Sequence, residues 1–265
     1  MLTIISIINA RRIKTRQKIS KSKMQKAKLR IKMQNMDATN KQYGLIFDVD
    51  GVIADTEAVN ARASIKVFAD LFGIEGVVRE DFEAGLGRGA EEYVRAAARV
   101  HGLELTDEQI EKATQLRQEY FLTALSHEPL PPFPGVLQLM NAAMQREDFR
   151  VAIATSGTLE KSRAVLEATH VPYRKMVYIN GNDVTHKKPD PELFLLAAER
   201  MGIEPANCAV IEDAPNGVEA AKAAGAKCIA VTNTTAAAKL SKADLVCDSL
   251  EQIDLDMIQE LIDSN

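Results

Sequence analysis

The part of the chain after residue 134 alternates helical and strand-like patterns, and this alternation constrains the fold more than any other feature of the sequence. Strands that alternate with helices form βαβ units, which build a parallel sheet covered by helices. The expected strands lie at 150–154, 175–179, 208–211, 227–231 and 244–247, and the expected helices at 135–146, 159–169, 191–201, 217–224 and 250–261. The sequence therefore predicts an α/β fold whose core is a Rossmann-like parallel sheet.

A further strand is expected earlier, at 43–47, and it ends in two aspartates. Asp48 and Asp50 are separated by one valine and followed by Gly51. Residues i and i+2 of an extended chain project to the same side, so the two carboxylates can share one site. Two like charges this close repel one another unless a cation or a shared proton relieves them. A strand that simply runs into an Asp-Gly turn is the alternative, and this motif alone does not decide between the two.

The segment between this strand and the rest of the sheet carries helical patterns and no convincing strand. The patterns cover 57–72, 91–100 and a stretch from the capping box at Thr106 to about residue 126. The sequence therefore predicts three parts: a basic N-terminal extension at 1–41 that is not part of the fold, a Rossmann-like core at 42–57 and 132–265, and a small inserted helical domain at 58–131.

Residues 1–41 differ from everything after them, because they carry twelve lysines and arginines and a single acid, Asp37. A secretory signal would place its basic residues before its apolar run, whereas here the apolar run at 2–8 comes first. A transit peptide to an organelle fits the scarcity of acids, but lysines outnumber arginines. An arm that contacts nucleic acid or a membrane surface is a third alternative. We favour an extension that contributes nothing to the fold.

The remaining composition is that of an ordinary globular protein. The net charge of −4 gives no argument for nucleic-acid binding. The three cysteines, Cys208, Cys228 and Cys247, lack metal-ligand spacing, and we expect reduced thiols in an intracellular protein. No apolar run reaches the roughly 18 residues that a membrane span needs. We expect a soluble cytoplasmic monomer, with an organellar location as the alternative.

Polar residues follow several of the expected strands. Thr155, Ser156 and Gly157 come directly after the strand at 150–154. A hydroxyl followed by backbone N–H groups at the start of a helix can bind an anion. The alternative is that Ser156 or Thr158 merely caps the next helix.

A lysine and two acids occupy comparable places near later strands. Lys188 precedes Pro189, which pushes the lysine toward an extended conformation, although a solvated surface lysine is the alternative. Glu212 and Asp213 close the strand at 208–211, and Mg²⁺ takes such carboxylates together with water and substrate phosphate. A solvated acidic turn is the alternative there. Together the motifs place acids, a hydroxyl loop and a lysine at one edge of one sheet, which indicates phosphoryl transfer.

This set of residues resembles the haloacid dehalogenase-like hydrolase superfamily. The four motifs are DVDGV from Asp48, Thr155, Lys188 and the pair Glu212-Asp213, and the resemblance spans roughly residue 43 to the C-terminus. Within the superfamily the chain is similar to the branch with a helical cap, which holds the β-phosphoglucomutase-like enzymes and many small phosphatases. True dehalogenases lack the second aspartate of the first motif, so its presence here argues against that chemistry.

The resemblance implies a Mg²⁺-dependent phosphoryl transfer. Asp48 would attack phosphorus and form an aspartyl-phosphate. Asp50 would protonate the leaving oxygen and then deprotonate the attacking water. The implied Mg²⁺ ligands are Asp48, the backbone carbonyl of Asp50, and Asp213, with Glu212 as a further ligand or a neighbour. The implied phosphoryl-binding groups are the Thr155 hydroxyl, the backbone N–H groups of Ser156 and Gly157, and Lys188.

The cap domain is expected to set substrate choice, and here the sequence departs from the mutase pattern. Asn60 stands where β-phosphoglucomutases carry a histidine, and Ala84 stands where they carry a lysine in the first cap loop. Arg88 is kept in that loop and is a candidate contact for a substrate anion, with a surface arginine as an equal alternative.

The leading hypothesis is a Mg²⁺-dependent phosphatase that acts on a small phosphorylated metabolite, such as a sugar phosphate. The first alternative is a β-phosphoglucomutase-like phosphomutase. The second is a non-catalytic binding protein that is tethered through its basic N-terminal arm.

Overall fold

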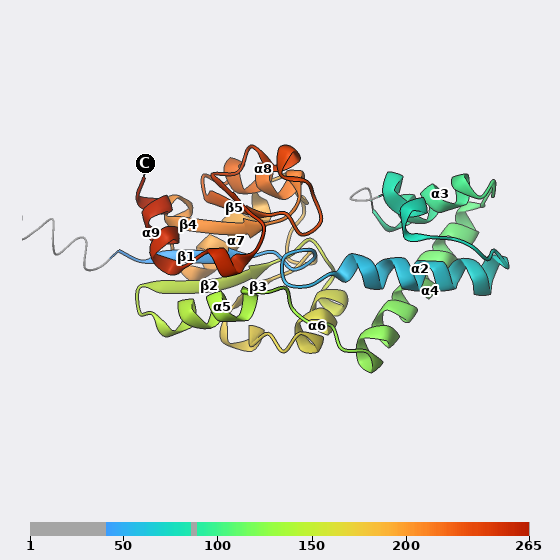
Figure 1. Ribbon diagram of the computed structural model, residues 1–265, viewed down its shortest axis with the longest axis horizontal. Coiled ribbons are helices and arrows are strands. Elements are labelled where there is room, and N and C mark those ends of the chain that lie inside the picture. The colour runs from blue at the N-terminus through green and yellow to red at the C-terminus, as the bar shows by residue number, and fades with distance from the viewer. Residues whose placement is uncertain (1–40, 86–88, 265) are drawn as a thin grey trace, which may run out of the picture. The chain divides into compact units, whose positions relative to one another are not determined.

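The computed structural model describes residues 41–85 and 89–264, and its centre is a six-stranded parallel sheet (Figure 1). The strand order is β3-β2-β1-β4-β5-β6, and each neighbouring pair runs parallel. The strands are β1 Tyr43–Phe47, β2 Phe149–Ala154, β3 Val177–Ile179, β4 Cys208–Glu212, β5 Lys227–Val231 and β6 Leu245–Cys247. The predicted α/β fold with a Rossmann-like parallel sheet is confirmed.

Helices cover both faces of this sheet, as continuous apolar strands require. They are α5 Val136–Gln145, α6 Leu159–Ala168, α7 Glu192–Met201, α8 Pro215–Ala223 and α9 Leu255–Asp263. Successive residues of β1 point to opposite faces. Leu45 and Phe47 belong to the hydrophobic cluster that contains side chains of α5, α6 and α9, whereas Ile46 belongs to the cluster of α7 and α8. The all-apolar run at 43–47 is therefore explained by burial on two sides.

The position of β1 in the strand order places the functional residues. The chain passes from β1 to β2 and β3 on one side and later to β4, β5 and β6 on the other. The carboxyl end of β1 is thus a topological switch point, where open α/β sheets bind their ligands.

The segment between β1 and β2 is helical, as the sequence predicts. It contains α2 Thr56–Phe72, the 3-10 helix η1 Arg79–Gly85, α3 Ala90–Val100 and α4 Asp107–His127. These helices share a hydrophobic cluster of their own, in which the rings of Phe82 and Tyr93 stack at a centroid distance of 4.7 Å. The chain from Tyr43 to Asn265 forms one compact unit. The division into a core and a cap domain stays a prediction that this separate cluster supports.

Local sequence signals locate some boundaries well and others less so. The capping box is confirmed: Thr106 Oγ1 accepts from the backbone N–H of Gln109, and Gln109 Oε1 accepts from the backbone N–H of Thr106. The predicted start of a strand at residue 175 is wrong. The backbone N–H groups of Lys175 and Met176 donate to carbonyls within a 3-10 turn, so pairing with β2 starts only at Val177.

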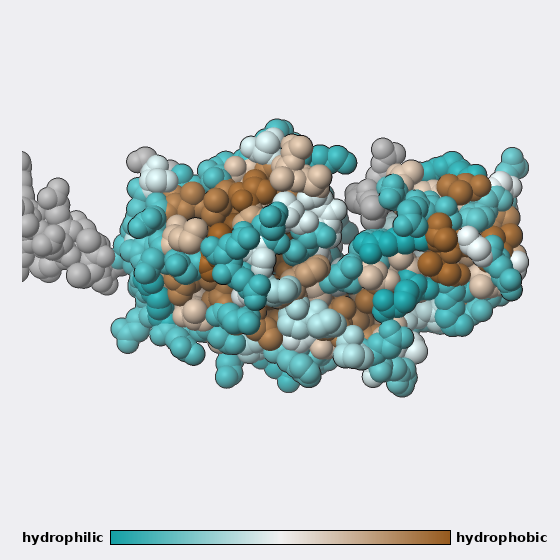
Figure 2. All heavy atoms as spheres, in the orientation of Figure 1, coloured by the Kyte–Doolittle hydropathy of each residue, from teal (hydrophilic) through white to brown (hydrophobic). Residues whose placement is uncertain are grey.

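The surface of the described residues carries both polar and apolar side chains. No helix among them is both long and apolar enough to cross a bilayer. Hydrophilic residues cover much of the face seen in Figure 2, and apolar residues show between them. The large apolar side chains that are exposed come from separate elements: Val78, Val100, Leu159, Leu195 and Met257. Such single exposures are normal for a globular protein.

The basic extension at 1–41 lies outside the described residues except for Lys41, and its role stays a prediction.

Candidate active site

The candidate active site lies where β1, β2 and β4 end. Asp48, Thr155 and Asp213 are the residues that directly follow these three strands. Phe47 is paired with Ile153 of β2 and with Ile211 of β4, so the three strands end at nearly the same level. The three polar side chains that follow are all buried.

Lys188 joins two of the acids. Its Nζ lies 2.5 Å from Asp48 Oδ1 and 2.5 Å from Glu212 Oε1, and the three side chains are only 7%, 8% and 1% exposed. Burial acts to lower the pKa of Lys188, but the two carboxylates outweigh burial and raise the pKa above its usual value. Lys188 is therefore charged at neutral pH. The structure brings this predicted residue to the predicted nucleophile.

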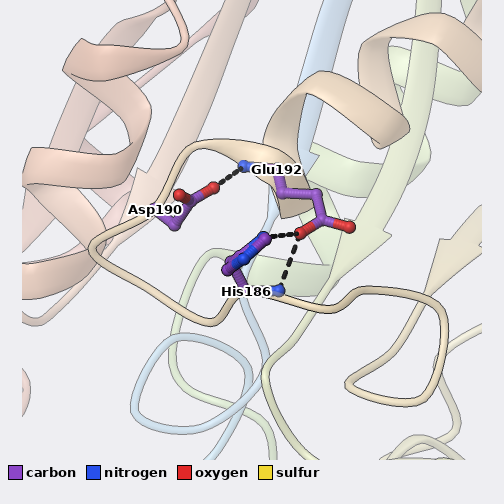
Figure 3. A group of neighbouring side chains, drawn as sticks. All are labelled: His186, Asp190 and Glu192. Carbon is purple, nitrogen blue, oxygen red and sulfur yellow. Dashed lines mark hydrogen bonds and ion pairs between the residues drawn. The ribbon is translucent and has the colours of Figure 1, made fainter.

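A cluster of polar side chains, His186, Asp190 and Glu192, stabilises the loop that carries Lys188 (Figure 3). The Glu192 carboxylate accepts from the backbone N–H groups of Thr185 and His186 and lies 3.0 Å from His186 Nδ1. Asp190 Oδ1 accepts from the backbone N–H of Glu192 at the start of α7. Because backbone donors already occupy these carboxylates, we interpret the group as the support of the loop rather than as a metal site.

Three buried carboxylates converge beside the Lys188 ammonium. Oxygens of Asp48, Glu212 and Asp213 lie within 4.8 Å of one another. Burial is the largest cause that raises the pKa of Asp48, and it also raises the pKa of Asp213 to about 7, with further contributions from the neighbouring acids. One ammonium leaves two negative charges uncompensated when all three acids ionise. The oxygen donors and the two uncompensated negative charges both fit a divalent cation such as Mg²⁺.

Two glycines permit this close packing of acids. Gly51 has φ of +80°, and a Cβ there would collide with the Asp213 carboxylate. A Cβ on Gly217 would collide with the carboxyl group of Glu212. The Glu212 carboxylate also accepts from the backbone N–H groups of Asp213 and Ala214, which fixes it under the start of α8.

The second aspartate of the first motif lies in a different environment. Thr56 Oγ1 donates to Asp50 Oδ1 at 2.5 Å, and Lys161 Nζ lies 3.1 Å from the same oxygen. Burial acts to raise the pKa of Asp50, but Lys161 and Thr56 outweigh it and the pKa falls below its usual value. The two aspartates therefore differ in the direction of their pKa shifts, because Lys161 and Thr56 favour the ionised form of Asp50, whereas burial favours the protonated form of Asp48.

The hydroxyl loop after β2 is arranged only partly as predicted. Thr155 is buried, and its Oγ1 accepts from the backbone N–H of Gly157 at 3.0 Å. That N–H group thus holds the threonine hydroxyl in this structure, instead of pointing unpaired at the site. Thr158 is the residue that caps α6, through the backbone N–H of Lys161. Ser156 takes no part in that cap, so its N–H stays a candidate phosphate contact.

Sequence reasoning missed four residues that hold the site together. They are Thr56 and Lys161 on Asp50, Thr234, whose hydroxyl donates to Asp213, and Asn233, whose Nδ2 donates to the Gly51 carbonyl at 2.9 Å. None of the four residues belongs to the four motifs. Asn233 and Thr234 follow β5 closely, so their place after a predicted strand was a signal that could have identified them. The predicted cap residue Arg88 lies outside the described residues.

A family model identifies the class of protein that this fold and site define. The model of the haloacid dehalogenase-like hydrolases matches residues 44–225. The matched region contains the four motifs, from Asp48 to Asp213. This chain belongs to the haloacid dehalogenase-like hydrolase family, and the resemblance seen in the sequence is confirmed.

Individual relatives agree with this class. The chain is 31% identical to Hexitol phosphatase A of Escherichia coli, over 79% of this chain and 92% of the relative. It is 31% identical to the protein SUPPRESSOR OF QUENCHING 1, chloroplastic, of Arabidopsis thaliana, over 84% of this chain but only 21% of that much longer relative. Among solved structures, CbbY from Rhodobacter sphaeroides in complex with xylulose-1,5-bisphosphate superposes with a TM-score of 0.71 at 27% identity, covering 82% of this chain and 99% of CbbY.

Proposed function

We propose that this protein is a Mg²⁺-dependent phosphatase that hydrolyses a small phosphorylated metabolite through an aspartyl-phosphate on Asp48. The observation that carries the proposal is the contact of one buried lysine, Lys188, with both Asp48 and Glu212, while Asp213 lies within reach of the same atoms. A nucleophilic carboxylate, a fixed cation and a cluster of oxygen donors are the parts that phosphoryl transfer needs. That every motif position is filled argues against the non-catalytic alternative.

The metal part of the proposal follows from the charges of the site. Phosphatases of this family generally use Mg²⁺. In this chain Asp48, Asp213 and the backbone carbonyl of Asp50 would hold the ion, and Glu212 would stand next to it. When bound, Mg²⁺ supplies positive charge that offsets the acids and the phosphoryl oxygens, which lets the anionic ester approach an anionic nucleophile.

The protein residues carry the two chemical steps. In the first, a carboxylate oxygen of Asp48 attacks phosphorus and the bond from phosphorus to the leaving oxygen breaks. Asp50, which takes up a proton when the anionic ester binds beside it, gives that proton to the leaving oxygen. In the second, Asp50 takes a proton from water, the water oxygen attacks phosphorus, and the bond to Asp48 breaks. Lys188 and the Thr155 hydroxyl hold the phosphoryl oxygens and balance the charge that develops on them.

The relatives guide the choice of substrates. Hexitol phosphatase A is named for a polyol phosphate, and CbbY holds a sugar bisphosphate in its crystal structure. We therefore place sugar and polyol phosphates first among substrates for this chain. The mutase alternative is less favoured, because Asn60 replaces the histidine of that group.

The test is phosphate release from a panel of sugar, polyol and carboxylic-acid phosphates, with Mg²⁺ and with EDTA. We expect release only with the metal, and a loss of at least about 10³-fold for Asp48→Asn. Glu199→Gln is the matched control, because Glu199 is an exposed carboxylate on α7 outside the site. Isomerised sugar phosphate without free phosphate would favour the mutase, and release that survives in Asp48→Asn would overturn the mechanism.

A further inference from the structure

The two oxygens of the Asp50 carboxyl group are in different environments. Oδ1 accepts from Thr56 Oγ1 and pairs with Lys161 Nζ. Oδ2 forms no hydrogen bond with any of the described residues. It faces the hydroxyl loop after β2, because a Cβ built on Gly157 would lie only 3.6 Å from it. One oxygen is therefore anchored, and the other is directed at the place where the phosphoryl group is expected.

Lys161 is itself held from two sides. It lies in the first turn of α6, and its side chain is only 20% exposed. Its Nζ lies 5.1 Å from the ring centroid of Phe121, a buried residue of α4. Cation–π contact at this distance adds to the ion pair in fixing the ammonium. Lys161 thus links the returning helix of the inserted segment to Asp50.

We propose that Lys161 is a positioning residue for acid–base chemistry, which binds Asp50 Oδ1 and so selects Oδ2 as the oxygen that transfers the proton. This inference rests on the proposed phosphatase function. It assigns a role to a residue outside the four motifs, on a helix that the mechanism does not otherwise use.

The physical reason is the freedom of a carboxyl group. The last torsion of an aspartate is broad, so an unanchored group presents either oxygen at varying distances. Proton transfer needs the donor within about 2.6–3.2 Å of the acceptor. A shift of about 1 Å can cost roughly 10²-fold in rate. Two donors on one oxygen remove this freedom, and Thr56 alone leaves rotation about the single hydrogen bond.

The proposal predicts a dependence on the leaving group. Phenyl phosphate releases a basic phenolate, with a conjugate-acid pKa of about 10 like that of the tyrosine phenol, and needs a proton as the bond breaks. In 2,4-dinitrophenyl phosphate the nitro groups make the departing phenolate weakly basic, so it leaves without protonation. Removal of the positioning residue should slow the first ester and spare the second. A residue that only stabilises the fold would slow both equally.

The experiment compares kcat/KM for the two esters in Lys161→Met, Lys161→Arg and the control Lys175→Met, an exposed lysine outside the site. The constant kcat/KM reports the steps through release of the phenol. For Lys161→Met we expect a loss on the order of 10- to 100-fold with phenyl phosphate and less than about 3-fold with the dinitrophenyl ester. Lys161→Arg should recover part of the loss, because it keeps a cation near Oδ1. The control should match the wild type.

Two further variants keep the test decisive if Lys161→Met folds poorly. Thr56→Val removes the other donor to Oδ1 and should show the same selective loss. Asp50→Asn should remove acid catalysis. Adding Lys161→Met to this variant should then cause no further loss of kcat/KM that is specific to phenyl phosphate, since the effects of coupled residues are non-additive. Equal losses for both esters, or full selectivity of Lys161→Met in the Asp50→Asn background, would overturn the inference. No phosphate release from either ester by the wild type would overturn the proposed function and the inference with it.

Discussion

The substitution Lys188→Met tests how far the buried carboxylates depend on the Lys188 ammonium, because it keeps an apolar side chain of similar size and removes the buried cation. The Lys188 ammonium makes two contacts of 2.5 Å, to Asp48 and to Glu212. All three side chains are less than a tenth exposed. Water therefore cannot solvate the two carboxylates that lose their ammonium partner unless the site rearranges.

The magnitude follows from these distances. With an effective dielectric constant of about 20, Coulomb's law gives roughly 7 kcal/mol of attraction for each contact at this separation. The cost of taking an ammonium out of water offsets much of that attraction. Removal of one partner of a buried pair nevertheless costs about 3–5 kcal/mol, because the remaining charge stays buried and unpaired. We therefore expect Lys188→Met to lower the free energy of unfolding by about 3–5 kcal/mol at pH 8 without metal.

The loss should depend on pH in a defined direction. The pKa of Asp213 is raised to about 7 by burial and by its acidic neighbours, and the pKa of Asp48 is also raised, chiefly by burial. Without Lys188 these values rise further. Acids with raised folded-state pKa values cost stability as pH climbs from their unfolded value of about 3.9 through the folded value. The destabilisation should thus be small near pH 5 and complete near pH 8, and Mg²⁺ should reduce it.

The assay is urea unfolding of Lys188→Met and wild type at both pH values, in EDTA and in Mg²⁺, with Lys175→Met as the control. The control should change stability by less than about 0.5 kcal/mol, as surface substitutions do. A loss below about 1 kcal/mol at pH 8, or a loss equally large at pH 5, would refute the reasoning. Either result would mean that the buried carboxylates do not depend on this ammonium.

Three further outcomes are expected. Mg²⁺ affinity, measured by calorimetry, should fall as pH drops below the Asp213 pKa of about 7, since protons compete with the cation; an affinity that is flat from pH 8 to pH 5 would contradict this. Gly217→Ala should displace the Glu212 carboxylate and cost about 1–3 kcal/mol of stability in thermal unfolding, whereas a neutral result would show that α8 can move away. Glu192→Ala should loosen the Lys188 loop and lower kcat by about 10-fold with little change in the denaturation midpoint; an unchanged kcat would show that the loop needs no brace.

The sequence predicted those parts of the site that depend on local order along the chain. Asp48 and Thr155 directly follow apolar runs, and Asp213 follows another with only Glu212 between, so naming the strands was enough to place them at one edge of a parallel sheet. Sheet register then brought them to one level, which the strand pairs of β1 confirm. The helix start at Thr106 was equally local, because both halves of the capping box lie within four residues.

The sequence could not predict contacts that arise from how helices pack. Lys161 reaches Asp50 from 111 residues away, and nothing in α6 marks it as different from a solvated lysine. Thr56 lies just before the helix expected at 57–72, and its donation to Asp50 depends on the turn through Gly51. The use of the Gly157 N–H by Thr155 was also hidden, since the sequence shows a hydroxyl and an N–H group but not which acceptor the N–H chooses. Tertiary packing decides each of these.

The most direct test of the account is to locate the phosphoryl group during turnover. The enzyme is mixed with its best substrate and Mg²⁺, quenched in acid within one turnover, digested and examined by mass spectrometry. We expect one phosphorylated peptide, the one that contains Asp48, with the group removed by hydroxylamine and absent in Asp48→Asn. Phosphate release without any phosphorylated Asp48, or with the phosphoryl group on another residue, would contradict the account.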